Sequence, residues 1–324
     1  MDDVVRILHY LAGSAITASI FGIFALGLNV HWGYTGLFNI GVAGFFAIGA
    51  YTTALVTTPL PSGISAIYIQ QAFGLDQPFL VGVIAAGLVA GLLAIPIGFL
   101  TLRLRGDYLA ITTIGIAETI RRVFNNEEWL ANGADGLDIG QPLRNLSFIP
   151  PNRYNFVYLI IVVIFMVVIY WALERGIRSP WGRVLRAVRE DEVVAAATGK
   201  DVFRFKMQSL VLGAVIMGIG GALYAHYAIS VNPSDFSPMY GTFIIWAMLI
   251  LGGSGNNKGA SLGAVIVWGI WSGTMLVTRQ IIPAMWSARA PYFRFLLIGL
   301  LILGTLLSRP QGIRGEEKQV SRML

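Results

Sequence analysis

The sequence predicts an all-α membrane protein, a polytopic transmembrane helix bundle of about 8–10 spans that each need about 20 residues. Of the 324 residues, 56% are hydrophobic and 12% are charged, and the mean hydropathy is +0.69. A typical soluble domain carries about 25% charged residues. Long apolar runs also recur along the whole chain, so we expect one transmembrane domain over residues 1–324.

The apolar segments follow one another in order. They cover about residues 11–30, 33–57, 78–101, 107–123, 154–173, 207–228, 238–253, 260–280 and 291–308. The segments 107–123 and 238–253 are short and contain glycine, so they are marginal as spans. All of these runs are too long for the roughly ten-residue alternating strands of a membrane barrel.

Loop charges predict which end of the bundle faces the cytoplasm, because Lys and Arg are retained on that side. The segment 174–206 is rich in them, with Arg175, Arg178, Arg183, Arg186, Arg189, Lys200, Arg204 and Lys206. The tail 309–324 and the turn with Arg103 and Arg105 are also basic. The loops 59–77 and 125–153 are expected outside. Counting spans puts the N-terminus outside, or inside if 33–57 or 107–123 only re-enters the membrane.

The segment 174–206 lies between two long apolar runs and is too charged to lie in hydrocarbon. Ser179-Pro180 is typical of a helix start, and Leu185–Ala197 is expected to form a short amphipathic helix that ends at Gly199. This helix could lie on anionic lipid. Three consecutive acids favour docking to another protein instead: Glu190, Asp191 and Glu192.

The run 29–44 combines glycines with polar side chains at membrane depth. Small residues allow close contact between helices in lipid, which is the simpler interpretation of these glycines. Alternatively, the run forms an unwound helix that lines a translocation path, as broken helices do in transporters. The candidate lining residues are Asn29, Tyr34, Thr35, Asn39 and Gly41.

Several kinds of chemistry find no support in the sequence. There is no cysteine for a disulfide or a thiolate metal site, and His9, His31 and His226 are scattered without metal-ligand spacing. The run Gly252–Gly259 lacks the Gly-Lys-Ser/Thr of a phosphate loop, so any ATP hydrolysis belongs to another subunit. No catalytic residues, metal site or cofactor are therefore predicted, and the chain is not expected to be an enzyme.

Two charge patterns have simple interpretations. Glu118 precedes Arg121 and Arg122 by three and four positions, which favours an ion pair on one helix over a proton relay. The net charge of +6 comes from basic loops held at the inner leaflet. It does not indicate a nucleic-acid partner.

The residues from Arg183 to Gly199, Arg-Val-Leu-Arg-Ala-Val-Arg-Glu-Asp-Glu-Val-Val-Ala-Ala-Ala-Thr-Gly, resemble the coupling segment of branched-chain amino-acid ABC-importer permeases. Three further strings agree with this family in order. They are Gly33–Gly36 continuing to Phe45–Tyr51, then Arg105–Ile111, then Leu251–Gly255. The resemblance covers roughly residues 25–310.

This resemblance implies a LivM-type permease subunit in the cytoplasmic (inner) membrane. It also implies its partners: a second, paralogous permease, two cytoplasmic ABC ATPases and a periplasmic or other extracytoplasmic substrate-binding protein. The 174–206 segment would be the cytoplasmic coupling loop that contacts an ATPase. The coupling residues implied are Arg183, Arg186, Arg189, Glu190, Asp191, Glu192, Ala196 and Gly199.

The chain departs from the family at Phe38–Val42, where a hydroxyl residue and a histidine are common. The expected cargo is therefore branched-chain or, more broadly, neutral amino acids. An importer of urea or short amides is an alternative within the class. A stand-alone secondary transporter is an alternative from another class, and it would predict membrane-embedded acids or two similar halves. Neither feature is evident in the sequence.

Overall fold

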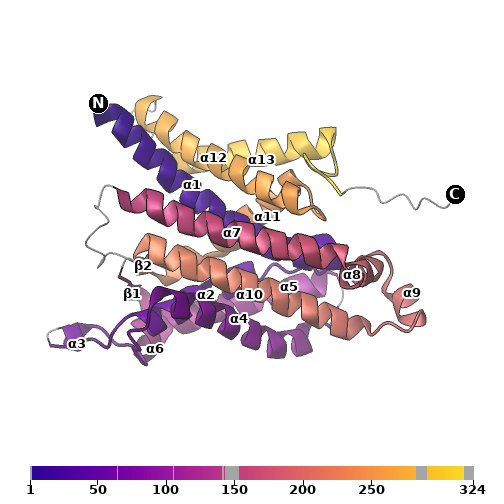
Figure 1. Ribbon diagram of the computed structural model, residues 1–324, viewed down its shortest axis with the longest axis horizontal. Helices are drawn as coiled ribbons and strands as arrows, with labels where there is room; N and C mark the ends of the chain where they lie inside the picture. Colours follow the sequence, from indigo (N-terminus) through magenta and orange to yellow (C-terminus); the bar gives the residue numbers. More distant parts are fainter. Residues whose placement is uncertain are drawn as a thin grey trace.

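The computed structural model describes residues 2–63, 65–104, 106–140, 142, 153–281 and 290–316. Its long helices lie side by side and run between two ends of one bundle (Figure 1). They are α1 (Asp2–Leu28), α2 (Val42–Thr57), α4 (Phe79–Thr101), α5 (Asp107–Asn126), α7 (Tyr154–Arg178), α10 (Val202–Ala228), α11 (Ile244–Gly252), α12 (Asn257–Ile281) and α13 (Ala290–Ser308). The predicted helical membrane bundle is confirmed.

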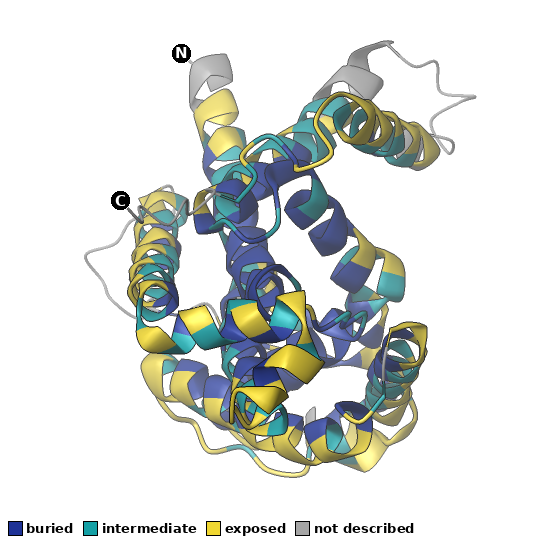
Figure 2. Cartoon of the chain, turned by 90° about the vertical axis from the view of Figure 1, so that its right-hand side faces the viewer, coloured by how far each residue is buried: buried dark blue, intermediate teal, exposed yellow. Residues whose placement is uncertain are grey.

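Among the described residues, 4 helical stretches are long and apolar enough to cross a membrane: Arg6–Tyr34, Phe79–Thr101, Tyr154–Arg178 and Val202–Ala228. The first and the last are largely buried, whereas α4 and α7 expose most of their surface. Figure 2 shows buried residues gathered in the centre and exposed residues on the outward sides of the helices. Exposed leucines such as Leu88 and Leu92 of α4 are typical of a surface that faces lipid.

Glycines allow the central helices to pack closely. A methyl group on Gly218 of α10 would lie 2.6 Å from the carbonyl oxygen of Ala86 in α4, and one on Gly49 of α2 would collide with Gly218 itself. The close backbone contact between α2, α4 and α10 therefore depends on the absence of side chains there. Gly44, within the run 29–44, makes the same kind of contact, since a methyl group there would lie 3.0 Å from Ala117 Cα in α5.

The first span ends in a break. After α1 the chain forms one π-helix, η1 (Asn29–Tyr34), and residues 36–41 are not helical before α2 begins at Val42. Gly36 has a φ of +74°, a conformation that glycine adopts more readily than other residues. The prediction of one continuous segment over 33–57 is therefore wrong at its start, while the predicted unwinding within 29–44 is present.

One end of the bundle collects the loops that were predicted to be external. The short strands β1 (Leu137–Asp138) and β2 (Ser230–Val231) pair antiparallel there, with Leu137 opposite Val231. Isolated bridges join Pro59 to Leu75 and Gln71 to Ala131. The remaining short elements at this end are α3 (Ser65–Tyr68), α6 (Glu128–Ala131), η2 (Gly133–Asp135) and η4 (Pro233–Phe236). η5 (Met239–Phe243) lies deeper in the bundle, where Thr242 Oγ1 accepts a hydrogen bond from the backbone N–H of Ala43 (3.1 Å). The all-α prediction is confirmed for the bundle and missed this two-stranded sheet among the described residues.

The opposite end carries α8 (Pro180–Glu190) and α9 (Glu192–Ala197). Beside them lie the turn between α11 and α12 and the tail up to Glu316. The start of α1 lies at the β1–β2 end, where the His9 ring contacts Phe156 near the start of α7. This arrangement supports the alternative in which the N-terminus is external. Arg105, named above for its charge, and residues 317–324 of the basic tail lie outside the described residues.

Candidate functional site

The helix α8 begins as the sequence predicts. Ser179 is its extended N-cap residue and Pro180 occupies the first helical position, where its missing N–H is no disadvantage. Leu185 and Val188 are buried on the inner side of α8, and Arg183 and Glu190 are exposed. The helix is therefore amphipathic, with one charged side free for a partner.

The predicted single helix Leu185–Ala197 is wrong, because the chain breaks at Asp191. Its backbone is extended, with φ −156° and ψ 110°. Its Oδ1 accepts hydrogen bonds from the backbone N–H groups of Val193 (2.8 Å) and Val194 (3.0 Å). A carboxylate that caps the first turn stabilises a new helix start, so α9 begins at Glu192. The predicted end is correct, since Gly199 follows α9 with a φ of +79°.

The three consecutive acids have different surroundings. Asp191 caps α9, and Glu192 forms an ion pair with Lys206 of α10, whose side chain is only 8% exposed. Only Glu190, with 72% of its side chain exposed, projects freely toward solvent while it pairs with Arg189. The acids therefore contribute less to an outer surface than the sequence suggests.

Apolar side chains are exposed on the outer surface of α9. Val193 and Val194 on α9 are 68% and 59% exposed, and Ala196 beside them is exposed too. These three residues form the α9 apolar patch. Exposed apolar residues rimmed by charged ones are typical of a protein contact. The sequence did not single out the two valines, because their exposure follows from the break at Asp191.

Arg189 connects α8 to two distant parts of the chain. Its guanidinium donates a hydrogen bond to the carbonyl oxygen of Gly33 in η1. It also donates to Glu316 Oε2 (2.7 Å) and to Glu190 Oε1 (2.8 Å). Burial lowers the pKa of Arg189, but hydrogen bonds to Glu190 and Glu316 raise it further, so the net pKa shift is upward. The side chain is fully charged and held in place.

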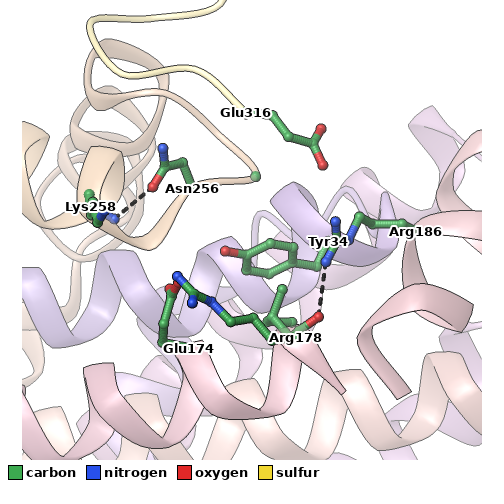
Figure 3. A pocket seen from close by; sticks show the side chains of 9 residues that line it. Tyr34, Glu174, Arg178, Arg186, Asn256, Lys258 and Glu316 are labelled. Atoms are coloured by element: carbon green, nitrogen blue, oxygen red, sulfur yellow. Dashed lines mark hydrogen bonds and ion pairs between the residues drawn. The ribbon is translucent and has the colours of Figure 1, made fainter. Parts of the chain in front are cut away.

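A cavity of about 320 Å³ opens between α7, α8, the α11–α12 turn and the tail (Figure 3). Its charged lining includes Glu174, Arg178, Arg186, Lys258 and Glu316. Arg186 donates to the carbonyl oxygen of Ile177 (2.9 Å), and its buried Nε–H has no partner among the described residues. Both signs of charge are present, so the lining does not select one simple ion.

The candidate path residues near the end of α1 are buried and bonded within the chain. The Asn29 side chain donates to Asn257 Oδ1 (3.1 Å) and accepts from the backbone N–H of Gly255 (2.9 Å). Thr35 Oγ1 lies 2.7 Å from Ser209 Oγ in α10. These bonds join η1 to α10 and to the α11–α12 turn, so the polar groups stabilise the break between α1 and α2.

The other candidate path residues have similar surroundings. Asn39 donates to His31 Nδ1 (3.0 Å) and accepts from the backbone N–H of Gly41 (2.7 Å). Gly41 lies so close to α5 that a methyl group there would be 2.6 Å from the carbonyl oxygen of Thr113. Tyr34 differs, because it lines the charged cavity. The structure thus brings these residues together around the broken segment and leaves little open space beside most of them.

Comparison with known proteins assigns the fold to a family. Residues 10–306 match the model described as branched-chain amino acid transport system / permease component. The chain belongs to this family. Its members are transport permeases, and this permease is therefore a multi-pass membrane protein.

Two relatives illustrate the similarity. This permease is 30% identical to the high-affinity branched-chain amino acid transport system permease protein LivM of Escherichia coli, over 92% of its own length and 68% of the relative. It is 27% identical to a probable branched-chain amino acid transport permease protein LivM of Methanocaldococcus jannaschii, over 92% and 91% of the two chains.

The family resemblance extends to permeases with other cargo. The nucleoside ABC transporter permease protein NupC of Lactococcus lactis is 24% identical over 84% of this permease and 86% of the relative. No solved structure matches the chain. Family membership therefore leaves open which cargo this permease carries.

The glycine-rich run between α11 and α12 is a turn in this permease, as the sequence predicts. Gly253 has a φ of +112°, and the tail packs against the turn. The backbone N–H of Ile313 donates to the Leu251 carbonyl oxygen and that of Arg314 to the Gly252 carbonyl oxygen, each at 2.9 Å. The glycines thus allow the backbone of the tail to lie close to the turn.

Proposed function

We propose that this permease forms half of the translocation path of an ATP-driven importer of branched-chain or other neutral amino acids in the cytoplasmic membrane. The observation that carries the proposal is the α9 apolar patch, which projects at the end of the bundle where basic residues gather. Two cytoplasmic ATPases would bind α8 and α9 of the two permease subunits. A second, paralogous permease would complete the path, and an extracytoplasmic binding protein would deliver the cargo.

The contacts of Arg189 support a route from ATP hydrolysis to the membrane. When α8 moves with an ATPase, Arg189 transmits the force to the carbonyl oxygen of Gly33. The non-helical residues 36–41 follow immediately, and such segments can absorb large backbone changes while the adjoining helices move as rigid bodies. In this proposal the non-helical residues 36–41 are the hinge, and the hydrogen bonds of Asn29, Thr35 and Asn39 hold it in place. Tyr34 lines the cavity beside the hinge.

A docking experiment tests the proposal. The permease is co-expressed with its cognate ATPases, second permease and binding protein, and carries Val193→Glu and Val194→Glu together. Two buried charges in an apolar contact are costly, so co-purification of the ATPases and ATP-driven uptake in proteoliposomes should both be lost. Lys200→Glu, at an exposed position on the same loop, is the matched control and should retain both. Full co-purification with the double variant would refute docking at α9.

The alternatives are separated by cargo and by energy source. A panel of leucine, alanine, urea and a nucleoside, offered to the complete transporter, identifies the class of cargo. Uptake by the permease alone under an ion gradient, without ATPases, would instead show a secondary transporter. We expect no such uptake, and the expected ATP-driven cargo is a neutral amino acid.

A further inference from the structure

The helix α5 differs from the other long helices in its exposed surface. Leu109, Thr113 and Ala117 are buried on one side, and the opposite side exposes Gly115, part of Glu118 and Arg122. Toward the start of the helix the same side exposes Tyr108 and Ile111, so its charged part is the stretch from Gly115 to Arg122. At a similar depth, the exposed side of α4 carries leucine and isoleucine. Exposed charged residues are therefore a feature of α5 and not of every helix in the bundle. No sequence pattern identified this side in advance, because Glu118 and its arginines were explained as an ion pair.

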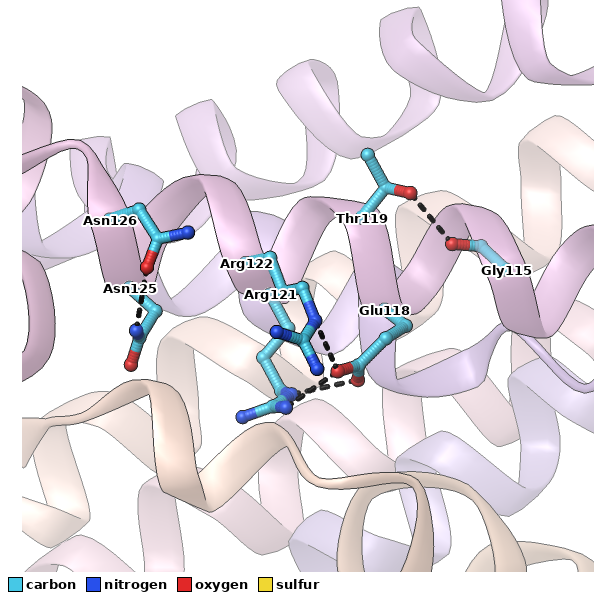
Figure 4. Close-up of polar contacts among 7 residues, drawn as sticks. All are labelled: Gly115, Glu118, Thr119, Arg121, Arg122, Asn125 and Asn126. Atoms are coloured by element: carbon cyan, nitrogen blue, oxygen red, sulfur yellow. Dashed lines mark hydrogen bonds and ion pairs between the residues drawn. The ribbon is translucent and has the colours of Figure 1, made fainter.

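That ion pair is present and is arranged unequally. Arg121 donates from Nε (2.8 Å) and Nη2 (2.6 Å) to the two oxygens of Glu118, and Arg122 donates only from Nε (3.1 Å). Figure 4 shows all three side chains on one side of α5. The terminal nitrogens of Arg122 have no partner among the described residues, and its side chain is 68% exposed. Arg121 therefore pairs with Glu118 through two parallel hydrogen bonds, and Arg122 presents its terminal N–H donors to the outside.

The depth of this cluster excludes lipid as its main neighbour. With a rise of about 1.5 Å per residue, Glu118 lies roughly 17 Å from Asp107 and roughly 12 Å from Asn126 along α5. Ala117, the residue before Glu118, packs against Gly44 of α2, so the cluster lies beside an apolar helix and not at an end of the bundle. An arginine on a lipid-facing surface at that depth costs about 2.5–3.5 kcal/mol. The part of α5 around Glu118 and Arg122 is therefore expected to face water or another polar surface.

We propose that this side of α5, defined by Gly115, Glu118 and Arg122, lines the water-filled translocation path beside the second permease, and that Arg122 binds the carboxylate of the cargo. The inference rests on the proposed import function. Two arginines against one acid leave an excess positive charge, and a free guanidinium fork matches a carboxylate in two parallel hydrogen bonds. Glu118 is a positioning residue that orients Arg122 through its Nε.

This site would recognise what all neutral amino acids share. A carboxylate is present in leucine, valine and alanine alike, and it is absent from urea and from nucleosides. Binding at Arg122 therefore predicts broad acceptance of amino acids and rejection of uncharged cargo. The choice among amino-acid side chains would then belong to the binding protein.

The buried side of α5 connects the site to the proposed hinge. Thr113 Oγ1 accepts a hydrogen bond from the backbone N–H of Ile40 (3.0 Å), within the non-helical segment. Gly44 at the start of α2 packs against Ala117, where a methyl group would lie 3.0 Å from the Ala117 Cα. A change in residues 36–41 thus reaches α5 through direct contacts. It would move Arg122 relative to the second permease.

Thiol labelling tests where α5 lies. The natural chain has no cysteine, so a single introduced thiol on this subunit can be followed. Gly115→Cys fits without contact, since a methyl group there meets nothing within 4 Å. We expect a charged, membrane-impermeant thiol reagent to label it in the complete transporter, and saturating leucine with binding protein to slow that labelling. Leu88→Cys on α4 is the control and should not react. Equal, negligible labelling at both positions would overturn the inference.

Uptake tests the role of Arg122. Loss of a charge-assisted hydrogen bond lowers binding by about tenfold or more, so Arg122→Gln should reduce ATP-driven leucine uptake by about tenfold. Stimulation of ATP hydrolysis by the binding protein should be retained, which shows that the complex is folded and assembled. Arg122→Lys, which keeps the charge, should restore part of the uptake. Normal leucine uptake by Arg122→Gln would refute the carboxylate site.

The two proposals fail in different ways. If the unmodified complex shows no ATP-driven uptake of any cargo, the import function is wrong, and Gly115→Cys labelling still decides whether α5 faces water. If the unmodified complex imports urea or nucleosides and not amino acids, the import function is correct in outline and the carboxylate site is wrong.

Discussion

The guanidinium of Arg189 in α8 donates a hydrogen bond to the carbonyl oxygen of Gly33, a residue 156 positions earlier in the chain. The contact joins the surface proposed to meet the ATPase to the point where the first membrane helix breaks. Gly36 lies against the same side chain, since a methyl group there would be 3.1 Å from Arg189 Cγ. A displacement of α8 therefore acts on the broken segment directly.

Removing the Arg189 side chain should separate ATP hydrolysis from transport. Arg189→Ala leaves the Gly33 carbonyl oxygen and Glu316 without a partner, at a stability cost of about 1–3 kcal/mol. We expect the ATPases to remain bound and to hydrolyse ATP, while uptake per ATP falls severalfold in proteoliposomes. Arg204→Ala, at an exposed position near the start of α10, should leave the ratio unchanged. An unaltered ratio for Arg189→Ala would contradict the proposed route.

Glu192→Ala should destabilise the folded permease by removing the partner of Lys206, which is largely buried. We expect a loss of about 2 kcal/mol, between the values typical of exposed and fully buried ion pairs. The measurement is the melting temperature of the purified permease in detergent. Glu190→Ala removes an exposed acid and should change the melting temperature little. Equal changes in melting temperature for Glu192→Ala and Glu190→Ala would show that the ion pair with Lys206 does not stabilise the permease.

Asp191→Ala should loosen α9 without unfolding the membrane helices. The variant removes the acceptor for the N–H groups of Val193 and Val194, and loss of an N-cap costs about 1 kcal/mol. Hydrogen exchange at those two amides should accelerate about fivefold, since that free energy corresponds to such a factor. Asp191→Asn retains a cap acceptor and should exchange nearly as slowly as the natural chain. Unchanged exchange in Asp191→Ala would mean that packing alone holds α9.

Gly218→Ala should impair packing at the centre of the bundle. The added methyl group would lie 2.6 Å from both the Ala86 carbonyl oxygen and the Ala90 Cβ. Overpacking of this kind typically costs about 1–3 kcal/mol. Thermal unfolding in detergent should therefore begin at a lower temperature. Gly269→Ala in α12 meets nothing within 4 Å and should be neutral or slightly stabilising. A neutral Gly218→Ala would show that α4 and α10 can separate at no cost.

The membrane helices could be predicted from the sequence because hydropathy depends on nearby residues. The apolar runs near α4, α7 and α10 were located within a few residues of their ends. The ion pair of Glu118 with Arg121 and Arg122 also follows from helical spacing, and it is confirmed. The span 33–57 was wrong at its start, because the break depends on contacts from η1 to α10 and to Gly255.

The surface proposed to bind an ATPase could be anticipated from the sequence only as a charged loop. The loop is charged as predicted, but Val193 and Val194 are exposed on α9, because Asp191 caps that helix and Glu192 pairs with Lys206. Whether an acid caps a helix nearby or pairs with a residue of another helix depends on which of the two contacts is more stable. The spacing of residues along the chain does not reveal this. The same holds for Arg189, whose partners Gly33 and Glu316 are remote in sequence. The exposed side of α5 was missed because exposure follows from tertiary packing.

The tail contacts have a consequence for biosynthesis. Ile313 and Arg314, which bind the α11–α12 turn, and Glu316, which binds Arg189, are translated after every helix of the described bundle. The helices α8 and α9 are therefore complete well before these residues leave the ribosome. Newly made and truncated chains therefore present α8 without the ion pair between Arg189 and Glu316. A protein that binds α8 and α9 could thus distinguish finished from unfinished permease, because only the finished chain has Glu316 bound to Arg189.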